Sequence, residues 1–177
     1  RFNLIPELNR LIDHEIELAK SGKQGRIILK MNALQDPAMI ERLYEASQAG
    51  VKIDLIVRGI CCLIPGRKYS RNIRVTRIVD TFLEHARVWY FGNGGKPKLF
   101  LGSPDWMRRN LYRRIEAVTP ILDPDLKREL SDMLSIQLSD KRKACFVDDH
   151  LRNRWKSARP QKEKIRSQYT FYEYLKG

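Results

Sequence analysis

The apolar positions in the first sixty residues predict a helix, a strand, a second helix and a second strand. Residues 4–21 place their apolar side chains at intervals of three and four, as an amphipathic helix does, and residues 37–49 follow the same spacing. Residues 26–32 and 51–57 are short and rich in branched side chains, as buried strands are. Strand, helix and strand at this separation predict a βαβ unit with parallel strands.

The following hundred residues predict more strands and one long helix. The apolar runs 88–91 and 98–101 flank an Asn-Gly-Gly turn and are expected to form a hairpin. Residues 124–138 place four leucines on one helix face, and we expect this stripe to be core: Leu126, Leu130, Leu134 and Leu138. Further strands are expected at residues 72–79, 113–121 and 141–147, the last at a sheet edge. The whole pattern predicts an α/β domain with a mixed sheet flanked by helices.

The end of the chain differs in composition from the rest. Residues 152–166 are strongly basic, poor in apolar side chains and interrupted by Pro160, so we expect a loop or a loosely ordered arm. Residues 167–176 carry four aromatic side chains and are expected to form a short helix. We therefore expect residues 1–150 to form the domain proper, with the basic arm and short helix of residues 151–177 packed on it.

The charge predicts an anionic partner. The net charge is +13, and between Arg58 and Arg114 thirteen lysines and arginines face three acidic residues. Arginine outnumbers lysine there, which favours partners whose phosphate oxygens can be gripped in pairs. A loop at residues 59–70, with a Pro-Gly turn, is expected to be able to close over such a ligand.

Cysteine usage and hydropathy indicate the kind of compartment in which the protein is expected. Cys61, Cys62 and Cys145 are too few and too poorly spaced for a disulfide framework or a zinc site, and we expect buried thiols in a reducing compartment. No apolar run reaches the roughly 20 residues of a membrane span. The chain begins Arg-Phe-Asn, and we expect it to be a piece of a longer protein.

The candidate chemistry centres on His85. This histidine precedes Arg87 and an apolar strand, and one hairpin later comes a Gly-Ser-x-Asp turn, Gly102 to Asp105, whose backbone N–H groups are expected to be free. Arg58 directly follows a predicted parallel strand, at the end where ligands of such sheets gather. A histidine among fixed cations can attack phosphorus or move protons on phosphate. With one good histidine, the chain is not expected to supply both roles.

Two resemblances sharpen this picture. His85-x-Arg87 followed by Gly102-Ser103-x-Asp105 resembles a degenerate half of the phospholipase D signature. It departs from that signature in four ways: arginine replaces lysine, no Asp lies seven residues after the histidine, the Gly-Ser pair comes late, and Asp105 stands where Asn is expected. Five longer runs, at residues 55–65, 78–88, 91–95, 103–110 and 114–124, resemble the carboxyl-terminal domain of bacterial polyphosphate kinase of the histidine-phosphorylating type.

This resemblance implies a fold and an activity. The domain would be a phospholipase-D-like mixed sheet, one of two in a larger enzyme that reversibly transfers the terminal phosphate of ATP to polyphosphate. The phosphorylated histidine belongs to a Lys-Ile-His-Ala-Lys motif of the preceding domain, which is absent here, and the Mg²⁺ ligands are also expected upstream. The expected partners are ATP or ADP, polyphosphate, the preceding domain and further copies of the enzyme, but not nucleic acid. The fragment is expected to be inactive alone, and its location cytoplasmic or peripheral to the inner membrane face.

The resemblance also implies site residues. Arg58 matches the family's nucleotide-contacting arginine, and His85 matches its second essential histidine, which contacts ATP phosphates or acts as an acid or base. The remaining expected ATP- and phosphate-binding residues are Arg87, Lys98, Ser103, Asp105, Arg109 and Asn110. No metal ligand is expected in this chain.

Two other functions stay open at the level of sequence. A phosphodiesterase half-domain would share the His-x-Arg and Gly-Ser pieces, although a second His-x-Lys is absent. A basic module that binds nucleic acid or another polyanion would account for the charge alone, with steeply salt-dependent binding.

Overall fold

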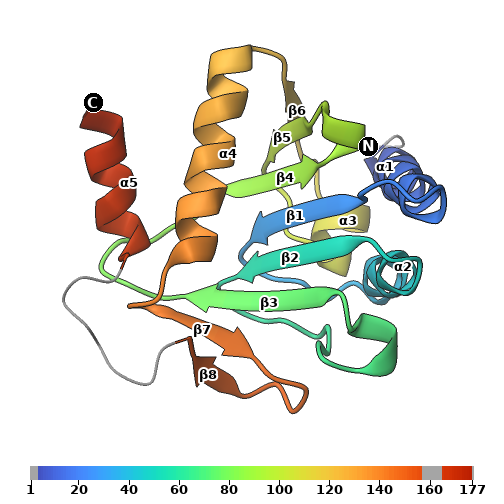
Figure 1. Cartoon of the computed structure of the whole chain (residues 1–177), viewed down its shortest axis with the longest axis horizontal. Helices are drawn as coiled ribbons and strands as arrows, with labels where there is room; N and C mark the ends of the chain where they lie inside the picture. The colour runs from blue at the N-terminus through green and yellow to red at the C-terminus, as the bar shows by residue number, and fades with distance from the viewer. Residues whose placement is uncertain (1–3, 157–164, 177) are drawn as a thin grey trace.

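Eight strands form one mixed sheet in the part of the chain that the computed structural model describes, residues 4–156 and 165–176. The strand order is β6-β5-β4-β1-β2-β3-β7-β8, and only the neighbouring pairs β1–β2 and β2–β3 are parallel (Figure 1). The strands are β1 (Arg26–Met31), β2 (Lys52–Val57), β3 (Ile73–Ile78), β4 (Arg87–Phe91), β5 (Lys98–Gly102), β6 (Val118–Ile121), β7 (Ala144–Val147) and β8 (Asn153–Trp155). The expected α/β class, a mixed sheet flanked by helices, is confirmed.

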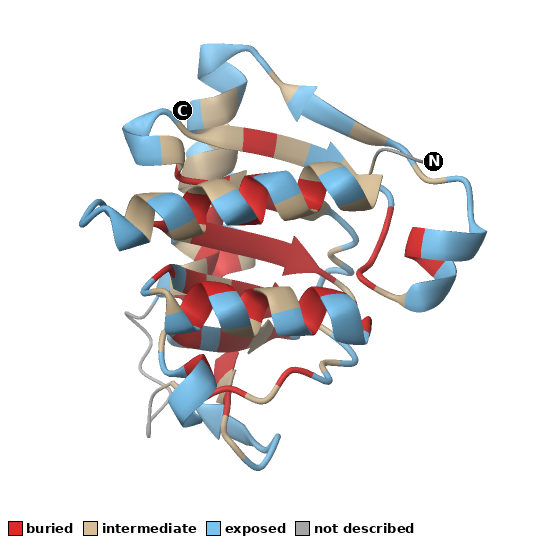
Figure 2. Ribbon diagram, turned by 90° about the vertical axis from the view of Figure 1, so that its right-hand side faces the viewer, coloured by how far each residue is buried: buried red, intermediate tan, exposed pale blue. Residues whose placement is uncertain are grey.

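Helices cover both faces of this sheet. The first two helices, α1 (Leu4–Lys20) and α2 (Pro37–Gln48), lie on one face, and α4 (Pro124–Ser139) and α5 (Ser167–Lys176) lie on the other (Figure 1). Figure 2 shows α1 and α2 in front of the sheet, each with buried residues on its inner side and exposed residues on its outer side. No helix in the described residues is long and apolar enough to cross a membrane.

Alternating side chains divide the core into two layers. Leu29 of β1 and Leu55 of β2 belong to the larger cluster, which packs against α1 and α2. Ile28 and Ile56, one residue away on the same strands, belong to the smaller cluster under α4. The apolar runs of these strands are therefore continuous because both faces of the sheet are covered.

Aspartate N-caps explain where the helices α2 and α4 begin. The predicted βαβ unit is confirmed, with Asp36 as the N-cap of α2: its carboxylate accepts a hydrogen bond of 3.0 Å from the N–H of Met39. Asp123 caps α4 in the same way, with 2.9 Å bonds from the N–H groups of Asp125 and Leu126. The predicted hairpin between β4 and β5 is also confirmed.

Several short elements differ from the prediction. A helix, α3 (Arg108–Arg113), follows the Gly-Ser turn where none was expected, and β6 occupies only the last four residues of the strand expected at residues 113–121. The strand β8 lies in the segment expected to be an unstructured arm and makes β7 an inner strand rather than an edge. The rest of that arm, residues 157–164, lies outside the described residues.

The leucine stripe of α4 is core over only part of its length. Leu134 is fully buried, and Leu130 and Leu138 pack at the margin of the smaller cluster. Leu126 is 52% exposed, so the expectation that all four leucines are core is wrong for this one. Leu126 lies in the first turn of the helix, and Leu122, shortly before the helix begins, is also exposed.

The three cysteines are free thiols, but they are not all buried as expected. Cys145 is buried, Cys61 is half-buried and Cys62 is exposed. Burial raises the pKa of the Cys61 thiol to about 11, which leaves it protonated and unreactive at neutral pH.

Candidate active site

Several of the expected site residues lie at one edge of the sheet. The carboxyl ends of the parallel strands β1, β2 and β3 lie at this edge, and so does the amino end of β4, because Lys30 near the end of β1 pairs with Val88 near the start of β4. The Gly-Ser turn lies there as well, since Gly102 at the end of β5 pairs with Arg87. His85, Arg87, Arg58 and this turn therefore share one edge of the sheet.

A buried carboxylate organises the cluster. Asp105 is 6% exposed, and its side chain accepts hydrogen bonds from Arg87 Nε at 3.2 Å and from an Arg87 terminal nitrogen at 3.1 Å. It also accepts from the backbone N–H groups of Asn32 at 2.8 Å and Ala33 at 3.3 Å. Burial raises the pKa of Asp105, but the bonds from Arg87 and from the two N–H groups outweigh it, and the net pKa lies below its usual value. Asp105 therefore orients Arg87, and it has little surface to offer a ligand.

Arg87 in turn holds His85. One terminal nitrogen of its guanidinium lies 3.0 Å from His85 Nδ1 and donates to the His85 carbonyl at 2.9 Å, and the other lies 3.3 Å from Nε2. The His85 side chain is otherwise on the exposed surface of the loop before β4. A relay therefore runs from the end of β1 through Asp105 and Arg87 to an exposed imidazole.

Arg58 is the second cation of the edge, and its backbone is fixed. It is half-buried, directly after β2, and its guanidinium makes no hydrogen bond or ion pair with any residue in the described ranges. The next residue, Gly59, donates to the Asn32 carbonyl at 2.8 Å, where an added Cβ would lie 3.0 Å from the Asn32 oxygen. Arg77 donates to the Gly59 carbonyl at 2.7 Å. The backbone at Arg58 is thus fixed while its side chain keeps its donors for a ligand.

The segment after Arg58 is fastened at its start. Leu34 donates to the Ile60 carbonyl at 2.9 Å and accepts from the Cys62 N–H at 2.8 Å. The N–H of Ile64 donates to the Tyr44 hydroxyl at 2.8 Å, and Leu63 is fully buried. The expectation that residues 59–70 form a loop able to close over a ligand is therefore wrong for residues 60–64, which are held against the core.

The hydrogen-bonding groups of Ser103 in the Gly-Ser turn already have partners within the chain. The Ser103 N–H donates to the Ala117 carbonyl at 2.9 Å, and its hydroxyl accepts from the Ala117 N–H at 3.0 Å and donates to Glu116. Its backbone N–H is therefore not free, contrary to expectation. Glu116 also accepts from Asn110 Nδ2 at 2.6 Å, so one carboxylate ties both residues together. Ser103 and Asn110 shape this edge but have few donors left for phosphate.

Two expected site residues lie elsewhere. Lys98 pairs with Phe91 at the far end of the β4–β5 hairpin, and four residues of strand place it about 13 Å from the Arg87 end. Arg109 is exposed on α3, where it lines a surface hollow with Arg108 and Arg113. The structure therefore does not bring Lys98 to His85, and it places Arg109 in a separate basic hollow.

Some contributors carried no recognisable sequence signal. Asn32 was missed, although its backbone holds Asp105 and its buried Nδ2 has no hydrogen-bond partner within the described ranges. Glu116 and Arg77 were also missed, because each contributes through hydrogen bonds to residues in other elements or turns. The sequence would have indicated Asn32 only if it had shown that the ends of β1 and β2 and the Gly-Ser turn lie together at one edge of the sheet.

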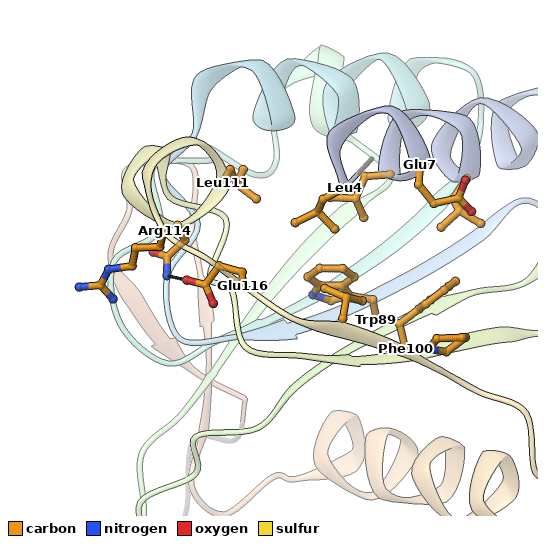
Figure 3. Close-up of a pocket in the computed structure, with 12 residues that line it drawn as sticks. Leu4, Glu7, Trp89, Phe100, Leu111, Arg114 and Glu116 are labelled. Carbon is orange, nitrogen blue, oxygen red and sulfur yellow. Dashed lines mark hydrogen bonds between the residues drawn. The ribbon is translucent and has the colours of Figure 1, made fainter. Parts of the chain in front are cut away.

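A mainly apolar cavity nearby has the wrong lining for phosphate. This cavity, of about 320 Å³, lies between α1, α3 and the β4–β6 strands and has mainly apolar walls (Figure 3). Trp89 and Phe100 lie on one side of it, and Leu4 and Leu111 on the other. His85, Arg87 and Arg58 do not line it. The polar edge at His85, and not this cavity, is the candidate active site.

A metal site is not evident in the described part of the chain. Among residues 4–156 and 165–176, no three His, Cys, Asp or Glu side chains lie so that they could hold a metal ion.

Comparison with known proteins decides the family. The family described as polyphosphate kinase C-terminal domain 2 matches residues 1–168. The chain belongs to this family. Polyphosphate kinase of Vibrio vulnificus is 46% identical over 172 residues, and that of Escherichia coli is 46% identical over 171 residues. These matches cover 97% and 96% of this chain but 24% and 25% of the relatives. The chain therefore spans about a quarter of the length of these relatives.

Solved structures agree with this membership of the polyphosphate kinase C-terminal domain 2 family. The crystal structure of polyphosphate kinase from Porphyromonas gingivalis matches with a TM-score of 0.96 and 55% identity, over 100% of this chain and 27% of that one. NucT from Helicobacter pylori matches with a TM-score of 0.56 and 14% identity, over 78% of this chain and 91% of that one. Nuc from Salmonella typhimurium, a phospholipase D family member, matches with a TM-score of 0.50 and 17% identity, over 70% of this chain and 84% of that one. The latter two show that the fold is phospholipase-D-like.

Proposed function

We propose that this chain supplies half of the active site of a polyphosphate kinase. In the proposed reaction a histidine of the preceding domain attacks the terminal phosphorus of ATP, a P–N bond forms, and the P–O bond to ADP breaks. The terminal oxygen of polyphosphate then attacks the phosphohistidine, so the P–N bond breaks and the polymer gains one phosphate. Both steps are reversible. The membership of the family and the likeness of the edge cluster to a phosphate site support this proposal.

Within that reaction Arg58 and His85 have separate tasks. Arg58 has its guanidinium donors available, and we assign it to the ATP phosphates, which a planar guanidinium can bind in pairs. Arginine only donates, and its contact with Nδ1, at 3.0 Å, is shorter than its contact with Nε2, at 3.3 Å. In a neutral His85 ring we therefore assign Nδ1 as the acceptor and place the proton on Nε2. That N–H then points a donor at a phosphate oxygen or gives its proton to the leaving oxygen.

The other expected site residues and partners belong to the same proposal. Arg87 and Asp105 set the orientation of His85, and Ser103 and Asn110 hold the turn beside it. Arg109 and Lys98 would meet phosphate only if the polymer extends beyond this edge. Mg²⁺, which ATP brings, would be held by residues outside this chain, as would the nucleophilic histidine, so the chain alone is expected to be inactive. The full enzyme would act on ATP and polyphosphate in the cytoplasm, as an oligomer.

One observation carries the proposal: the two positions that the sequence pairs with ATP, Arg58 and His85, lie at the same strand edge. They come from different connections, after β2 and before β4, and the strand order sets β1 between those two strands. Fixed cations at the carboxyl ends of parallel strands form a site for an anionic ligand.

Replacing Arg58 tests the nucleotide-binding half of the proposal. In the full-length enzyme, Arg58→Ala is expected to raise the KM for ATP by about tenfold, because about 1.4 kcal/mol corresponds to that factor and a charge-assisted bond contributes at least as much. Steady-state polyphosphate synthesis over a range of ATP concentrations measures it. The control is Arg128→Ala, an arginine that is 68% exposed on α4 and is expected to leave KM unchanged. An Arg58→Ala enzyme with the KM of the wild type would remove Arg58 from the site.

A further inference from the structure

The loop that carries His85 has little structure of its own. Residues 79–86 connect β3 to β4 without a helix or strand. The apolar side chains at its centre are mostly in solvent, with Phe82 58% and Leu83 76% exposed. Apolar burial therefore contributes little to the conformation of this loop, and its polar contacts must hold it in place.

Gln168 of α5 makes three of those contacts. Its Oε1 accepts from the Phe82 N–H at 2.8 Å, and its Nε2 donates to the Phe82 carbonyl at 2.7 Å. The same Nε2 donates to Glu84 Oε1 at 3.0 Å. One side-chain amide thus pairs with a whole backbone residue of the loop and also reaches the residue next to His85.

Glu84 is held from two further elements. Its Oε2 accepts from Lys30 Nζ of β1 at 2.5 Å and from Gln137 Nε2 of α4. Lys30 is 6% exposed and contributes its charge from inside the sheet. The carboxylate of Glu84 is therefore a fixed point of the loop, shared among β1, α4 and α5, one residue from the imidazole.

The first turn of α5 is itself anchored. Ser167 donates from both its N–H and its hydroxyl to Asp140 Oδ2, each at 2.7 Å, and Asp140 is fully buried. Arg166 donates to the two carboxylate oxygens of Asp80, at the start of the loop, at 2.6 and 2.8 Å. Gln168 thus has a rigid base from which to hold the loop.

We infer that Gln168 is a positioning residue for His85, acting through the Phe82 backbone and Glu84. The inference rests on the proposed function, in which His85 works on the transferring phosphate. It assigns to the carboxyl-terminal helix, far from β4 in sequence, the task of keeping the imidazole where Arg87 and the phosphate can meet it. Misplacing a catalytic group by about 1 Å can lower the rate about a hundredfold, so we expect the loss of these three hydrogen bonds to lower kcat.

The test uses full-length enzyme with Gln168→Ala and Gln168→Glu. The alanine removes all three bonds, and the glutamate keeps the acceptor for Phe82 but loses both donations and sets a second carboxylate against Glu84. We expect kcat for polyphosphate synthesis to fall about tenfold or more in both, with KM for ATP within about twofold of wild type and an unchanged melting temperature. Amide exchange of residues 79–86 is expected to accelerate. The control is Glu173→Gln, at the exposed far end of the same helix, which is expected to have wild-type kcat.

The outcomes separate the two claims. A wild-type kcat in Gln168→Ala overturns the inference, and so does a fall in kcat matched by an equal fall in the folded fraction, because that would be a purely structural effect. A raised KM with unchanged kcat overturns it as well. If His85→Ala abolishes synthesis while Gln168→Ala does not, only the inference fails. If His85→Ala leaves synthesis intact, the proposed function has failed.

Discussion

At the scale of single residues, the site depends on a hierarchy among its charged groups. Asp105 is buried and accepts four hydrogen bonds, Arg87 is spent on Asp105 and His85, and only His85 and Arg58 present their side chains outward. A buried carboxylate is tolerated in this cluster because both of its oxygens accept hydrogen bonds. These three residues therefore differ in role: Asp105 anchors, Arg87 orients, and His85 is the exposed member to which the proposed function assigns the ligand.

The anchoring role of Asp105 predicts a pH-dependent contribution to stability. Its pKa is lower in the folded chain than its usual value, so its stabilisation is complete above the usual pKa and is lost as the pH falls through the folded-state pKa. We expect Asp105→Asn to lower the free energy of unfolding by about 3 kcal/mol near pH 7, because the Arg87 side chain, which is only 12% exposed, is left without its carboxylate partner. The difference from wild type should shrink as the pH falls below about 4.

Urea unfolding at several pH values measures this effect. The control is Asp125→Asn, whose carboxylate is 78% exposed and paired with Arg128, and which should change stability by less than about 0.5 kcal/mol at any pH. A difference between wild type and Asp105→Asn that stays constant from pH 7 to pH 3 would contradict the anchoring role.

At the scale of elements, strong periodic patterns gave correct predictions and short elements did not. The βαβ unit, the β4–β5 hairpin and the start of α4 follow from apolar spacing, an Asn-Gly-Gly turn and an Asp-Pro cap. Six-residue α3 and three-residue β8 have no such signal, because α3 has no side-chain cap and β8 depends on pairing with β7. The partial exposure of the α4 leucine stripe could not be predicted either. The spacing of apolar residues shows which face of a helix is apolar, but not how far the sheet extends beneath that face.

The uneven burial of α4 predicts unequal costs for the same substitution. Leu134→Ala removes a fully buried side chain from the smaller core cluster and should lower the free energy of unfolding by about 2–5 kcal/mol. Leu126→Ala, two turns earlier on the same stripe and 52% exposed, should cost less than about 0.5 kcal/mol. Chemical denaturation of the two variants compares them directly, and equal losses would show that the stripe is buried throughout.

At the scale of the whole molecule, topology decides which predicted residues form a site. Arg58 was predicted from its place after a parallel strand, and the sheet does put it at the same edge as His85. Lys98 was predicted as one of the cations near His85 in sequence and from the family resemblance, and the antiparallel hairpin carries it to the opposite edge. Sequence could name the residues, but it could not say which edge each strand would present, because the order β5-β4-β1-β2-β3 depends on contacts between distant segments.

The strong positive charge of the chain is consistent with the proposed function. Under the proposed function, the net charge of +13 would suit a surface that binds ATP and polyphosphate, and the exposed Arg108 and Arg109 of α3 would extend that surface beyond the edge. The chain covers about a quarter of the related polyphosphate kinases, so the opposing half of the proposed pocket would come from the remainder of the enzyme. The central claim is that His85 belongs to that shared pocket.

Polyphosphate synthesis by full-length His85→Ala enzyme tests the claim most directly. Loss of the imidazole should lower kcat by at least about a hundredfold, the lower range for a positioned acid or base, while the melting temperature stays that of wild type. His150→Ala, which removes an imidazole that is 62% exposed, is the matched control and should retain full activity. A folded His85→Ala enzyme that makes polyphosphate at the wild-type rate would contradict the account.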